Sequence, residues 1–454
     1  MIVMKFGGTS VGIAENFKVA TRLVAERKPR DPIVVVSALS GMTNLLVEFC
    51  REAASRRDLT ARFAERHSEL AKATGLDERT IAPLLSSWRE EAATHQGGQK
   101  PLDSERRDRV LAYGEQLSAA LFAAGLRALG LEATAVLAAD AGLVTDDRFG
   151  AAHPLPDAFT QLRASLGRRP PVPVVTGFLG RTTDGRVTTL GRGGSDYSAA
   201  LIGAALDAEE IQIWTDTSGM LSAGPRVVPE ARPVARLSFA EASELAYFGA
   251  KVLHPKTLLP AMEREIPVRI LNTARPDDPG SIITAGVEPT PGPWRVKSIA
   301  SRAGITAVTI ASTRMLLAHG FLARVFEIFG RHHVVVDLVT TSEVSISVTV
   351  DDATRLEAAI PDLEAIGRVE VRRGLAIVAV VGEGAPQQIG LAGHLFTLLG
   401  GVGVGLEMIS QGASRVNLSF VVREEDVDRA VRLLHRGLGL DAEPAPMMVK
   451  TTMK

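Results

Sequence analysis

The chain has 454 residues, of which 46% are hydrophobic and 23% charged, and its formal net charge is −1. This charge gives no reason to expect nucleic acid or an anionic membrane as a partner, and no apolar run approaches the roughly 20 residues that span a bilayer. The single cysteine, Cys50, excludes an internal disulfide, and the length predicts about three domains in a cytoplasmic enzyme or sensor.

Apolar runs alternate with longer helical patterns over about the first 285 residues. We expect strands at 2–6, 33–37, 133–137, 172–177, 211–215 and 268–272, and helices at 15–27, 103–129 and 195–206. This alternation predicts an α/β domain with a mostly parallel sheet sandwiched by helices. Because ligands bind beyond the carboxyl ends of such strands, motifs that directly follow a strand are the candidate site.

The first such motif is KFGGTSV, residues 5–11. A glycine pair after a strand lets backbone N–H groups approach phosphate oxygens, and Lys5 offers a point charge for a transferred phosphoryl group. The motif is not a Walker A loop, because the lysine precedes the glycines. A tight turn with an exposed lysine is the alternative, and the motif alone leaves both open.

Two further segments carry polar residues of ambiguous role. Ser37 and Thr43, in VVVSALSGMTN (34–44), can bind a carboxylate or phosphate, or simply cap a helix. Glu115 lies in a helical pattern beside Leu111 and Leu117. Most such acids lie on a solvated face, whereas a partly buried one can pair with an ammonium group.

The strongest local signal is TTLGRGGSDYSAAL, residues 188–201. Arg192 lies among three glycines and offers a planar fork for a carboxylate. Asp196 follows at a position suited to capping a helix, where it needs no function, although it could also orient Lys5 or a metal ion. The later segments WTDTSGMLSAGPR (214–226) and FGAKVLHPKTL (248–258) suit a nucleotide-holding loop and add a second cation, Lys251; His254 is expected to be structural.

The pattern changes after GVEPTPGP (286–293), whose prolines and glycines are typical of a linker. We expect a βαββαβ unit with strands at 305–312, 334–339, 344–351 and 368–373 and helices near 320–332 and 353–366. A second βαββα series follows, with strands at 375–382, 404–410 and 415–423 and helices near 387–399 and 425–437. A spare strand at 295–301 would complete this second unit.

The motifs KFGGTSV, SALSGMTN, GRGGSDYSAAL, WTD and FGAKVLHPKTL occur in this order and together resemble the aspartate kinases of the amino-acid kinase family. The resemblance spans essentially the whole chain. It implies an amino-acid kinase domain over 1–290 and two ferredoxin-like ACT domains over 305–374 and 375–454, the second completed by the strand near 295–301. TTSEVSISV and MISQGASRVNLSFVV are similar to ACT signatures.

The same resemblance implies the reaction and its residues. L-Aspartate is phosphorylated on its side-chain carboxylate by ATP, giving 4-phospho-L-aspartate, with Mg²⁺ carried by ATP and no metal held by the protein. Lys5 and Asp196 are the implied catalytic residues. The implied substrate contacts are Ser37, Thr43, Glu115, Arg192, Gly193, Gly194 and Ser195, and the implied ATP contacts are Lys5, Gly7, Gly8, Thr9, Thr215, Asp216, Leu221, Arg226 and Lys251.

The ACT segments imply feedback by an end-product amino acid. The stretch around 320–343 is most similar to the lysine-sensitive, single-function class, which makes L-lysine the expected effector, with threonine as an alternative. The implied effector-site positions are Met315, Phe321, Leu322, Val336, Asp337 and Ser342. ACT strands commonly pair across subunits, so we expect a homodimer or a higher oligomer.

Three positions depart from the family pattern. Leu221 replaces an aromatic residue, Gly224 replaces an aspartate before Pro225, and Val335 replaces a small polar residue. The first two could weaken nucleotide binding, and they are the support for an alternative function, a catalytically weakened kinase that acts as an amino-acid sensor. A sister kinase for another acidic amino acid is a third hypothesis, which the paired ACT tail disfavours.

Overall fold

The computed structural model describes residues 1–96, 100–167, 171–249, 253–287, 293–312, 319–412 and 415–441. The chain forms two compact units. The first unit comprises Met1–Met220, Ala235–Phe239 and Lys251–Gly286, and the second comprises Leu221–Val234, Ala240–Ala250 and Val287–Lys454. Most of the expected linker, residues 288–292, lies outside the described residues.

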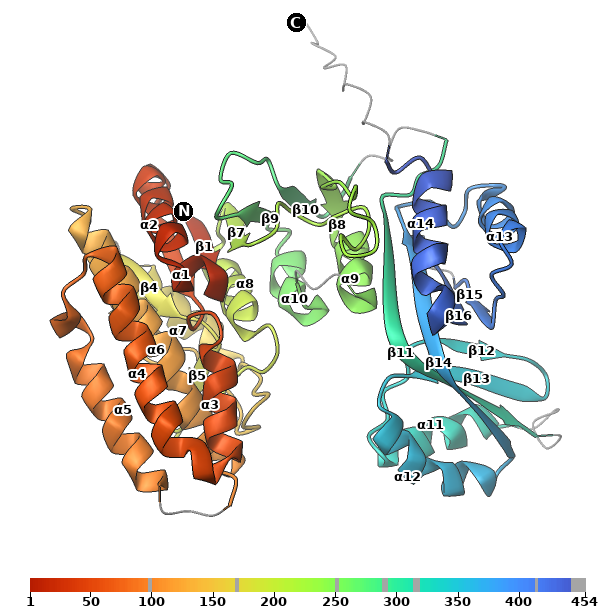
Figure 1. Cartoon of the computed structure of the whole chain (residues 1–454), viewed down its shortest axis with the longest axis horizontal. Coiled ribbons are helices and arrows are strands. Elements are labelled where there is room, and N and C mark those ends of the chain that lie inside the picture. Colours follow the sequence, from red (N-terminus) through yellow and green to blue (C-terminus); the bar gives the residue numbers. More distant parts are fainter. Residues whose placement is uncertain are drawn as a thin grey trace, which may run out of the picture. The chain divides into compact units, whose positions relative to one another are not determined.

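The first unit is built on an eight-stranded sheet of order β3-β4-β2-β1-β7-β9-β10-β8 (Figure 1). The strands are β1 (Ile2–Phe6), β2 (Pro32–Val36), β3 (Ala133–Val136), β4 (Val172–Thr176), β7 (Glu210–Thr215), β8 (Arg236–Ser238), β9 (Val268–Asn272) and β10 (Ser281–Thr284). Every neighbouring pair is parallel except β9 and β10. The prediction of a mostly parallel sheet is confirmed.

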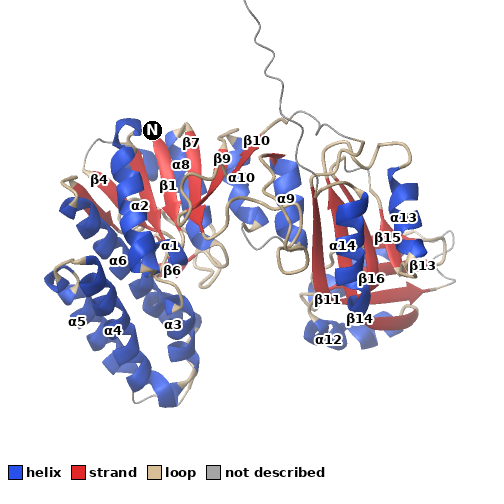
Figure 2. Ribbon diagram, turned by 45° about the horizontal axis from the view of Figure 1, so that its top comes forward, coloured by secondary structure: helices blue, strands red, loops and turns tan. Residues whose placement is uncertain are grey.

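Helices cover both faces of this sheet (Figure 2). They are α1 (Gly8–Gly12), α2 (Ala14–Glu26), α3 (Met42–Arg51), α4 (Arg56–Thr74), α5 (Ala82–His95), α6 (Ser104–Ala128), α7 (Asp157–Leu166), α8 (Gly194–Leu206) and α10 (Pro255–Glu263). A small hairpin, β5 (Leu179–Arg181) with β6 (Val187–Thr189), adjoins α6. Among the described residues, no helix is both long and apolar enough to cross a bilayer.

The side chains of strand β1 alternate between the two faces of the sheet. Met4 and Phe6 join the core formed with α2 and α6, where the Phe6 ring lies 5.2 Å from that of Phe122. Because successive side chains of a strand point to opposite faces, Lys5 points to the face covered by α8. The sequence therefore places one cation among buried apolar neighbours, at the carboxyl end of the strand.

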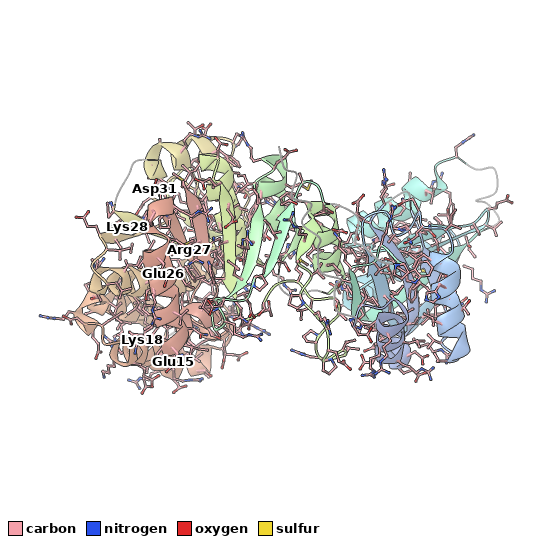
Figure 3. All side chains as sticks on the ribbon, turned by 90° about the horizontal axis from the view of Figure 1, so that it is seen from above. Glu15, Lys18, Glu26, Arg27, Lys28 and Asp31 are labelled. Carbon is pink, nitrogen blue, oxygen red and sulfur yellow. The ribbon has the colours of Figure 1, made fainter. Side chains whose placement is uncertain are left out.

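Helix α2 illustrates the complementary pattern on the surface. Its residues Phe17, Leu23 and Val24 are buried, at the spacing expected for one apolar face of a helix. Figure 3 labels charged residues on this helix and just after it. Those that are exposed are Glu15, Lys18, Glu26, Lys28 and Asp31.

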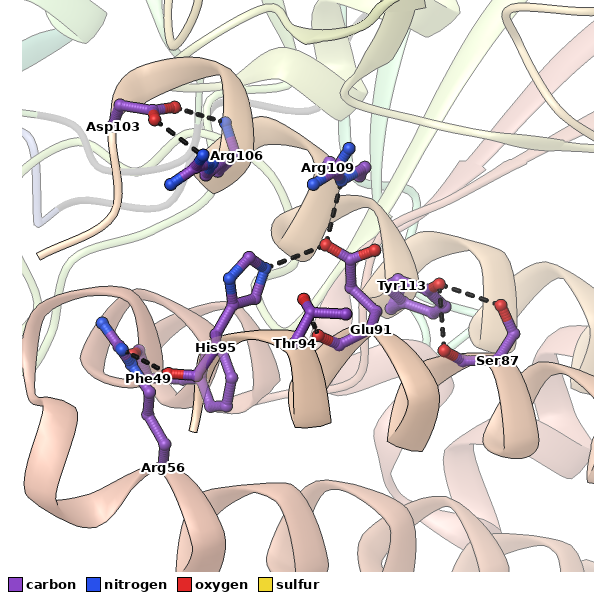
Figure 4. Close-up of polar contacts among 10 residues, drawn as sticks. All are labelled: Phe49, Arg56, Ser87, Glu91, Thr94, His95, Asp103, Arg106, Arg109 and Tyr113. Atoms are coloured by element: carbon purple, nitrogen blue, oxygen red, sulfur yellow. Dashed lines mark hydrogen bonds and ion pairs between the residues drawn. The ribbon is translucent and has the colours of Figure 1, made fainter. Parts of the chain in front are cut away.

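Buried and partly buried charges connect α3, α5 and α6 (Figure 4). Arg56 is almost fully buried and donates to the carbonyl oxygens of Phe49 and His95, in the last turns of α3 and α5, at 3.1 and 2.7 Å. A cation at helix C-termini is favourable because of the helix dipole. Glu91 of α5 accepts hydrogen bonds from His95 and from Arg109 of α6, both at 2.9 Å. These contacts hold α5 against α6.

The second unit contains a six-stranded antiparallel sheet of order β12-β13-β11-β14-β16-β15. Its strands are β11 (Ser298–Ala311), β12 (Val339–Thr341), β13 (Ser345–Val350), β14 (Arg368–Val381), β15 (Met408–Ser410) and β16 (Asn417–Arg423). Its helices are α11 (Phe321–Arg331), α12 (Ala353–Glu364), α13 (Leu391–Gly401) and α14 (Val427–Gly437), together with nearly all of α9 (Phe239–Phe248). Figure 1 shows α13 and α14 along one half of β11 and β14, and α11 and α12 along the other.

The two long strands differ from the expectation. Separate strands were expected at 295–301 and 305–312, and again at 368–373 and 375–382, but each pair is one continuous strand, β11 or β14. The two strands pair along their lengths, with register shifts near Ile305 and with glycines of positive φ, Gly304 and Gly374, at the junctions. Antiparallel pairing carries each strand through its glycine, so two hydrophobic cores share one sheet.

The strand expected at 334–339 is also wrong in extent, because the ladder begins only at Val339. Upstream of it Leu338 N donates to the Thr349 side-chain oxygen at 2.9 Å, while Asp337 N donates to Thr349 O at 2.9 Å and Thr349 N donates to Leu338 O at 3.0 Å, so the pairing continues there only irregularly. The strand expected at 404–410 likewise shortens to β15, Met408–Ser410. Apolar residues alone predicted these strands, and apolar composition does not say which backbone groups find partners.

Candidate active site

The carboxyl ends of four parallel strands meet at one edge of the first unit's sheet. Lys5 is near the end of β1, Ser37 follows β2, Gly177 follows β4, and Thr215 ends β7. Backbone bonds extend this edge beyond the strands, with Ser37 N donating to Phe6 O at 3.1 Å and Gly177 N to Val36 O at 2.9 Å. This is the edge at which an open α/β sheet binds its ligands.

At this edge Lys5 forms an ion pair with Asp196 of α8. The Lys5 Nζ and Asp196 Oδ1 atoms are 2.6 Å apart, and the Lys5 residue is only 7% exposed. Asp196 lies in the first turn of α8, where the helix dipole favours a negative charge. The pair fixes the lysine ammonium group at the end of β1, within a cavity that a ligand can enter.

The turn before α8 carries Arg192 between two glycines of positive φ. Gly191 and Gly193 have φ of +77° and +71°, a conformation that strongly favours glycine. Arg192 is exposed, and within the described part of the chain its guanidinium has no hydrogen bond or ion pair. His254, expected to be structural, caps α10 by accepting from Lys256 N at 3.3 Å. Arg192 is thus exposed with no partner for its guanidinium among the described residues.

Glu115 of α6 is a buried acid, 3% exposed, and not the solvated residue that its helix alone would suggest. Its Oε1 accepts from Ala38 N at 3.0 Å, whereas its buried Oε2 has no hydrogen-bond partner among the described residues. Burial raises the pKa of this carboxyl to about 8, although the Ala38 amide and the charge of Lys5 act in the opposite direction. A cation bound at Oε2 would restore its ionised form.

A cavity of about 400 Å³ joins these groups. The predicted catalytic and substrate residues all line it: Lys5, Ser37, Thr43, Glu115, Arg192, Gly193, Gly194, Ser195 and Asp196. Opposite charges therefore converge on a space the size of a small polar ligand. Among the described residues there is no cluster of three or more His, Cys, Asp or Glu that could hold a metal ion.

The glycine pair after β1 serves packing as well as any ligand. A Cβ atom on Gly8 would lie 2.9 Å from Ala38 O, so only glycine lets α1 approach the loop after β2. Gly7 N donates to Trp214 O at 3.0 Å. This amide is engaged within the protein, which corrects the expectation that both glycine amides are available to phosphate oxygens; of the pair, only Gly8 N can serve in that way.

Only some of the predicted ATP contacts lie in the first unit. Thr9 follows the glycine pair, and Thr215 and Asp216 lie together at the end of β7, where the Thr215 hydroxyl donates to Asp216 Oδ1 at 3.2 Å. Leu221 and Arg226 belong to the second unit, and Lys251 lies outside the described residues. At the departure Gly224, an added Cβ would meet no atom within 4 Å, so packing does not require glycine there.

The predicted effector positions lie around α11 and β12 of the second unit. Phe321 is buried, Val336 is partly buried, and Leu322 and Ser342 are exposed; Met315 lies outside the described residues. Ser342 Oγ shares a hydrogen bond with Ser345 Oγ at 2.8 Å.

Asp337, the remaining one of these positions, has a side chain only 1% exposed. Its Oδ1 pairs with Arg302 at 3.3 Å and accepts from the Tyr247 hydroxyl of α9, whereas its buried Oδ2 has no hydrogen-bond partner in the described residues. Burial raises the pKa of this carboxyl, and the bonds from Tyr247 and Arg302 lower it.

Among the charged residues that line the cavity, sequence reasoning missed Arg107, and it also missed the role of the adjacent Asp108. Arg107 lines the cavity, and Asp108 is fully buried behind it. A signal was present, because residues 107, 111 and 115 follow the i, i+4, i+8 spacing of one helix face. That face could be recognised as a site wall only once Glu115 was known to be buried.

Comparisons with known proteins agree with this description. Residues 1–272 match the model of the amino acid kinase family, and residues 378–438 match an ACT domain model. Aspartokinase 1, chloroplastic, of Arabidopsis thaliana is 38% identical over 469 residues, covering 99% of this chain and 82% of that protein.

Solved structures give the same result. E. coli aspartokinase III in complex with aspartate and ADP (R-state) superposes with a TM-score of 0.84 at 35% identity, covering 97% of this chain and 100% of that one. The same enzyme in complex with lysine and aspartate (T-state) has a TM-score of 0.76 at 35% identity, with 96% and 99% covered.

Proposed function

This chain belongs to the aspartokinases of the amino acid kinase family, and from that premise we propose how its cavity works as an aspartate kinase. L-Aspartate binds with its ammonium group on Glu115 Oε2, its α-carboxylate on Arg192 and its side-chain carboxylate toward Lys5. The observation that carries this assignment is the convergence of a buried, unpartnered carboxylate oxygen, an unpaired guanidinium and a fixed lysine on one cavity. The aspartate in the E. coli aspartokinase III complex supports it.

The proposed chemistry requires no general base. The substrate side-chain carboxylate has a reference pKa near 4 and is ionised at pH 7. One of its oxygens attacks the γ-phosphorus of ATP, the bond from that phosphorus to the β,γ-bridging oxygen breaks, and ADP leaves with the bond electrons. Lys5 stabilises the negative charge on the transferring group, and Asp196 holds the lysine in place.

On the nucleotide side, Gly8, Thr9, Thr215 and Asp216 are the described residues that we assign to ATP, and Leu221, Arg226 and Lys251 complete the assignment from the sequence. The ADP in the E. coli aspartokinase III complex supports an adenine nucleotide as a ligand of this chain. We assign Mg²⁺ to the ATP phosphates, whose charge it would offset when bound. Of the carboxylates of the cavity, Asp196 pairs with Lys5, and Glu115 accepts from the Ala38 amide and is assigned to the substrate ammonium group.

The direct test is to trap the acyl phosphate with hydroxylamine, using purified protein, Mg-ATP and L-aspartate. Aspartyl hydroxamate above a blank with Lys5→Ala is the expected result. Folded protein that gives no hydroxamate across a range of ATP concentrations would contradict the proposed catalysis and favour the amino-acid sensor. In that case Leu221 and Gly224 are the first residues to revert.

We further propose that L-lysine is the effector and that it binds in the second unit, with one ammonium group on Asp337 Oδ2. That oxygen is a buried acceptor on one of the predicted effector positions, which also include Phe321, Leu322, Val336, Ser342 and Met315. The lysine in the E. coli T-state complex supports this choice. The hydroxamate assay with added L-lysine or L-threonine tests it, because inhibition by threonine alone would overturn lysine.

An exposed apolar surface supports a homodimer. Leu322 and Phe326 of α11 are 43% and 40% exposed, and Val335, Val339 and Val344 are exposed beside them in the chain. We propose that a second copy of the chain covers this surface. Light scattering should give a dimer mass for the wild type and a monomer mass for Phe326→Asp; an unchanged mass in the variant would remove α11 from the interface.

A further inference from the structure

Helix α6 forms one wall of the substrate cavity. Arg107 is the lining residue nearest to the N-terminus of this helix. Arg107, Leu111 and Glu115 all line the cavity. Since an α-helix rises 1.5 Å per residue, the Cα atoms of Arg107 and Glu115 are about 12 Å apart along the helix. An extended arginine side chain spans roughly half of this distance, and helical side chains lean toward the helix N-terminus, so a ligand that extends from Glu115 along this wall comes within reach of Arg107.

Arg107 differs from the arginines beside it on the same helix. Arg106 pairs with Asp103 at 3.4 Å, and Arg109 pairs with Glu91 at 2.9 Å, as Figure 4 shows. Arg107 is exposed, and in the described segments its guanidinium has neither a hydrogen bond nor an ion pair. The neighbouring arginines have structural partners, whereas Arg107 is left for a ligand.

The base of Arg107 is fixed to the cavity wall by the next residue. The Asp108 carboxylate accepts from Gly150 N, Thr189 N and the Thr189 hydroxyl, at 2.8, 2.7 and 2.9 Å. The same loop touches the arginine turn, since a Cβ on Gly191 would lie 3.1 Å from Gly150 O. Asp108 therefore holds the first turns of α6 against the loop at Gly150, which packs against the turn that carries Arg192.

We propose that Arg107 is a second substrate-binding arginine, which contacts the α-carboxylate of the amino-acid substrate together with Arg192. This inference rests on the proposed function. The side-chain carboxylate cannot be its target, because that group must reach Lys5 at the end of β1. Arg107 also changes the charge balance: when Glu115 is ionised, as binding of the substrate ammonium group requires, the charged side chains lining the cavity total +1 with Arg107, complementing L-aspartate at −1, and zero without it.

The test compares L-aspartate with its α-carboxamide, L-isoasparagine, which keeps the reacting side-chain carboxylate but lacks the α-charge. Arg107→Met should raise the KM for L-aspartate about tenfold or more, because hydrogen bonds to a charged group are among the stronger ones, and should change kcat less than about twofold. Arg107→Lys should recover part of the loss. With L-isoasparagine, wild type and Arg107→Met should differ less than about twofold.

The matched control is Arg106→Met, an arginine on the same turn of α6 that does not line this cavity; its KM should stay at the wild-type value. An unchanged KM in Arg107→Met, or an equal loss with L-isoasparagine, would overturn the assignment. Calorimetry of L-aspartate binding to wild type and Arg107→Met tests whether Arg107 binds the substrate without relying on catalysis. A wild type that binds aspartate without turnover would contradict the proposed reaction, and the two affinities would still decide the role of Arg107.

Discussion

Each unit of the molecule contains a buried carboxylate with an oxygen that, among the described residues, has neither a hydrogen bond nor an ion pair. In the first unit it is Glu115 Oε2, in the cavity of the kinase fold. In the second unit it is Asp337 Oδ2, among the predicted effector positions. Burial raises the pKa of both groups. We assign both oxygens to an ammonium group, of the substrate in one unit and of the effector in the other.

The two carboxylates differ in what already holds them. Glu115 receives a single backbone amide, from Ala38. Asp337 is bound by the charged Arg302 and by the hydroxyl of Tyr247, which comes from α9. An effector that binds Asp337 must therefore share this carboxylate with Arg302 and Tyr247. Tyr247 belongs to α9, which is adjacent in sequence to Lys251. The substrate site is open for binding, whereas the effector site is coupled to other parts of its unit.

The largest expected effect separates catalysis from effector binding. Lys5→Ala should lower kcat on the order of a thousandfold, because the developing phosphoryl charge loses its fixed cation, while L-lysine binding measured by calorimetry stays at the wild-type affinity. Retained lysine binding also shows that the variant is folded. Lys18→Ala, at an exposed lysine of α2, is the control and should keep full activity. Normal turnover in Lys5→Ala would remove it from the catalytic site.

The next effect tests the second carboxylate. Asp337→Asn should raise the L-lysine concentration for half-inhibition at least about tenfold, since a charged acceptor for an ammonium group is lost, and should leave the kcat without lysine unchanged. Asp351→Asn is the matched control, because Asp351 pairs with the same Arg302 but has no such buried oxygen. Equal loss of inhibition in both variants would assign the effect to the Arg302 network rather than to an effector contact.

The pKa of Glu115 predicts a pH dependence of substrate binding. The carboxyl is raised to about 8, so it is charged above that pH and becomes neutral as the pH falls. An ammonium group needs the charged form, and the KM for L-aspartate should rise about fivefold between pH 8 and pH 7. Glu115→Gln should have a higher KM that no longer varies over this range. The same pH profile in both proteins would exclude Glu115 as its origin.

The smallest effect addresses the difference between the two carboxylates directly. Tyr247→Phe removes the hydroxyl that competes for Asp337, and half-inhibition by L-lysine should occur at a concentration lowered about two- to fivefold. Tyr113→Phe, in the first unit, removes the hydroxyl bonded to Ser87 and should leave inhibition unchanged. Weaker inhibition in Tyr247→Phe would show that this hydroxyl supports the effector site and does not compete with the effector.

Short-range information in the sequence was enough for most of the fold and for the chemistry-bearing residues. Strand β9 begins and ends where expected, and β1 does as well. Alternation of strands and helices predicted the parallel sheet, because both periods are local properties. Lys5, Arg192 and Asp196 became candidates in the same way, because glycine turns and strand ends are recognisable from consecutive residues, whereas their roles were implied by the resemblance to aspartate kinases.

Tertiary structure decided everything that depends on what packs against a residue. It brought Lys5 into contact with Asp196, which lies far away in the sequence. It also buried Glu115 and formed the hydrogen bond from the Gly7 amide to Trp214. It joined four expected strands into β11 and β14, because each half finds an antiparallel partner only when the distant strand is in place. Burial and pairing depend on residues far away in the chain, so no local pattern in the sequence could specify them.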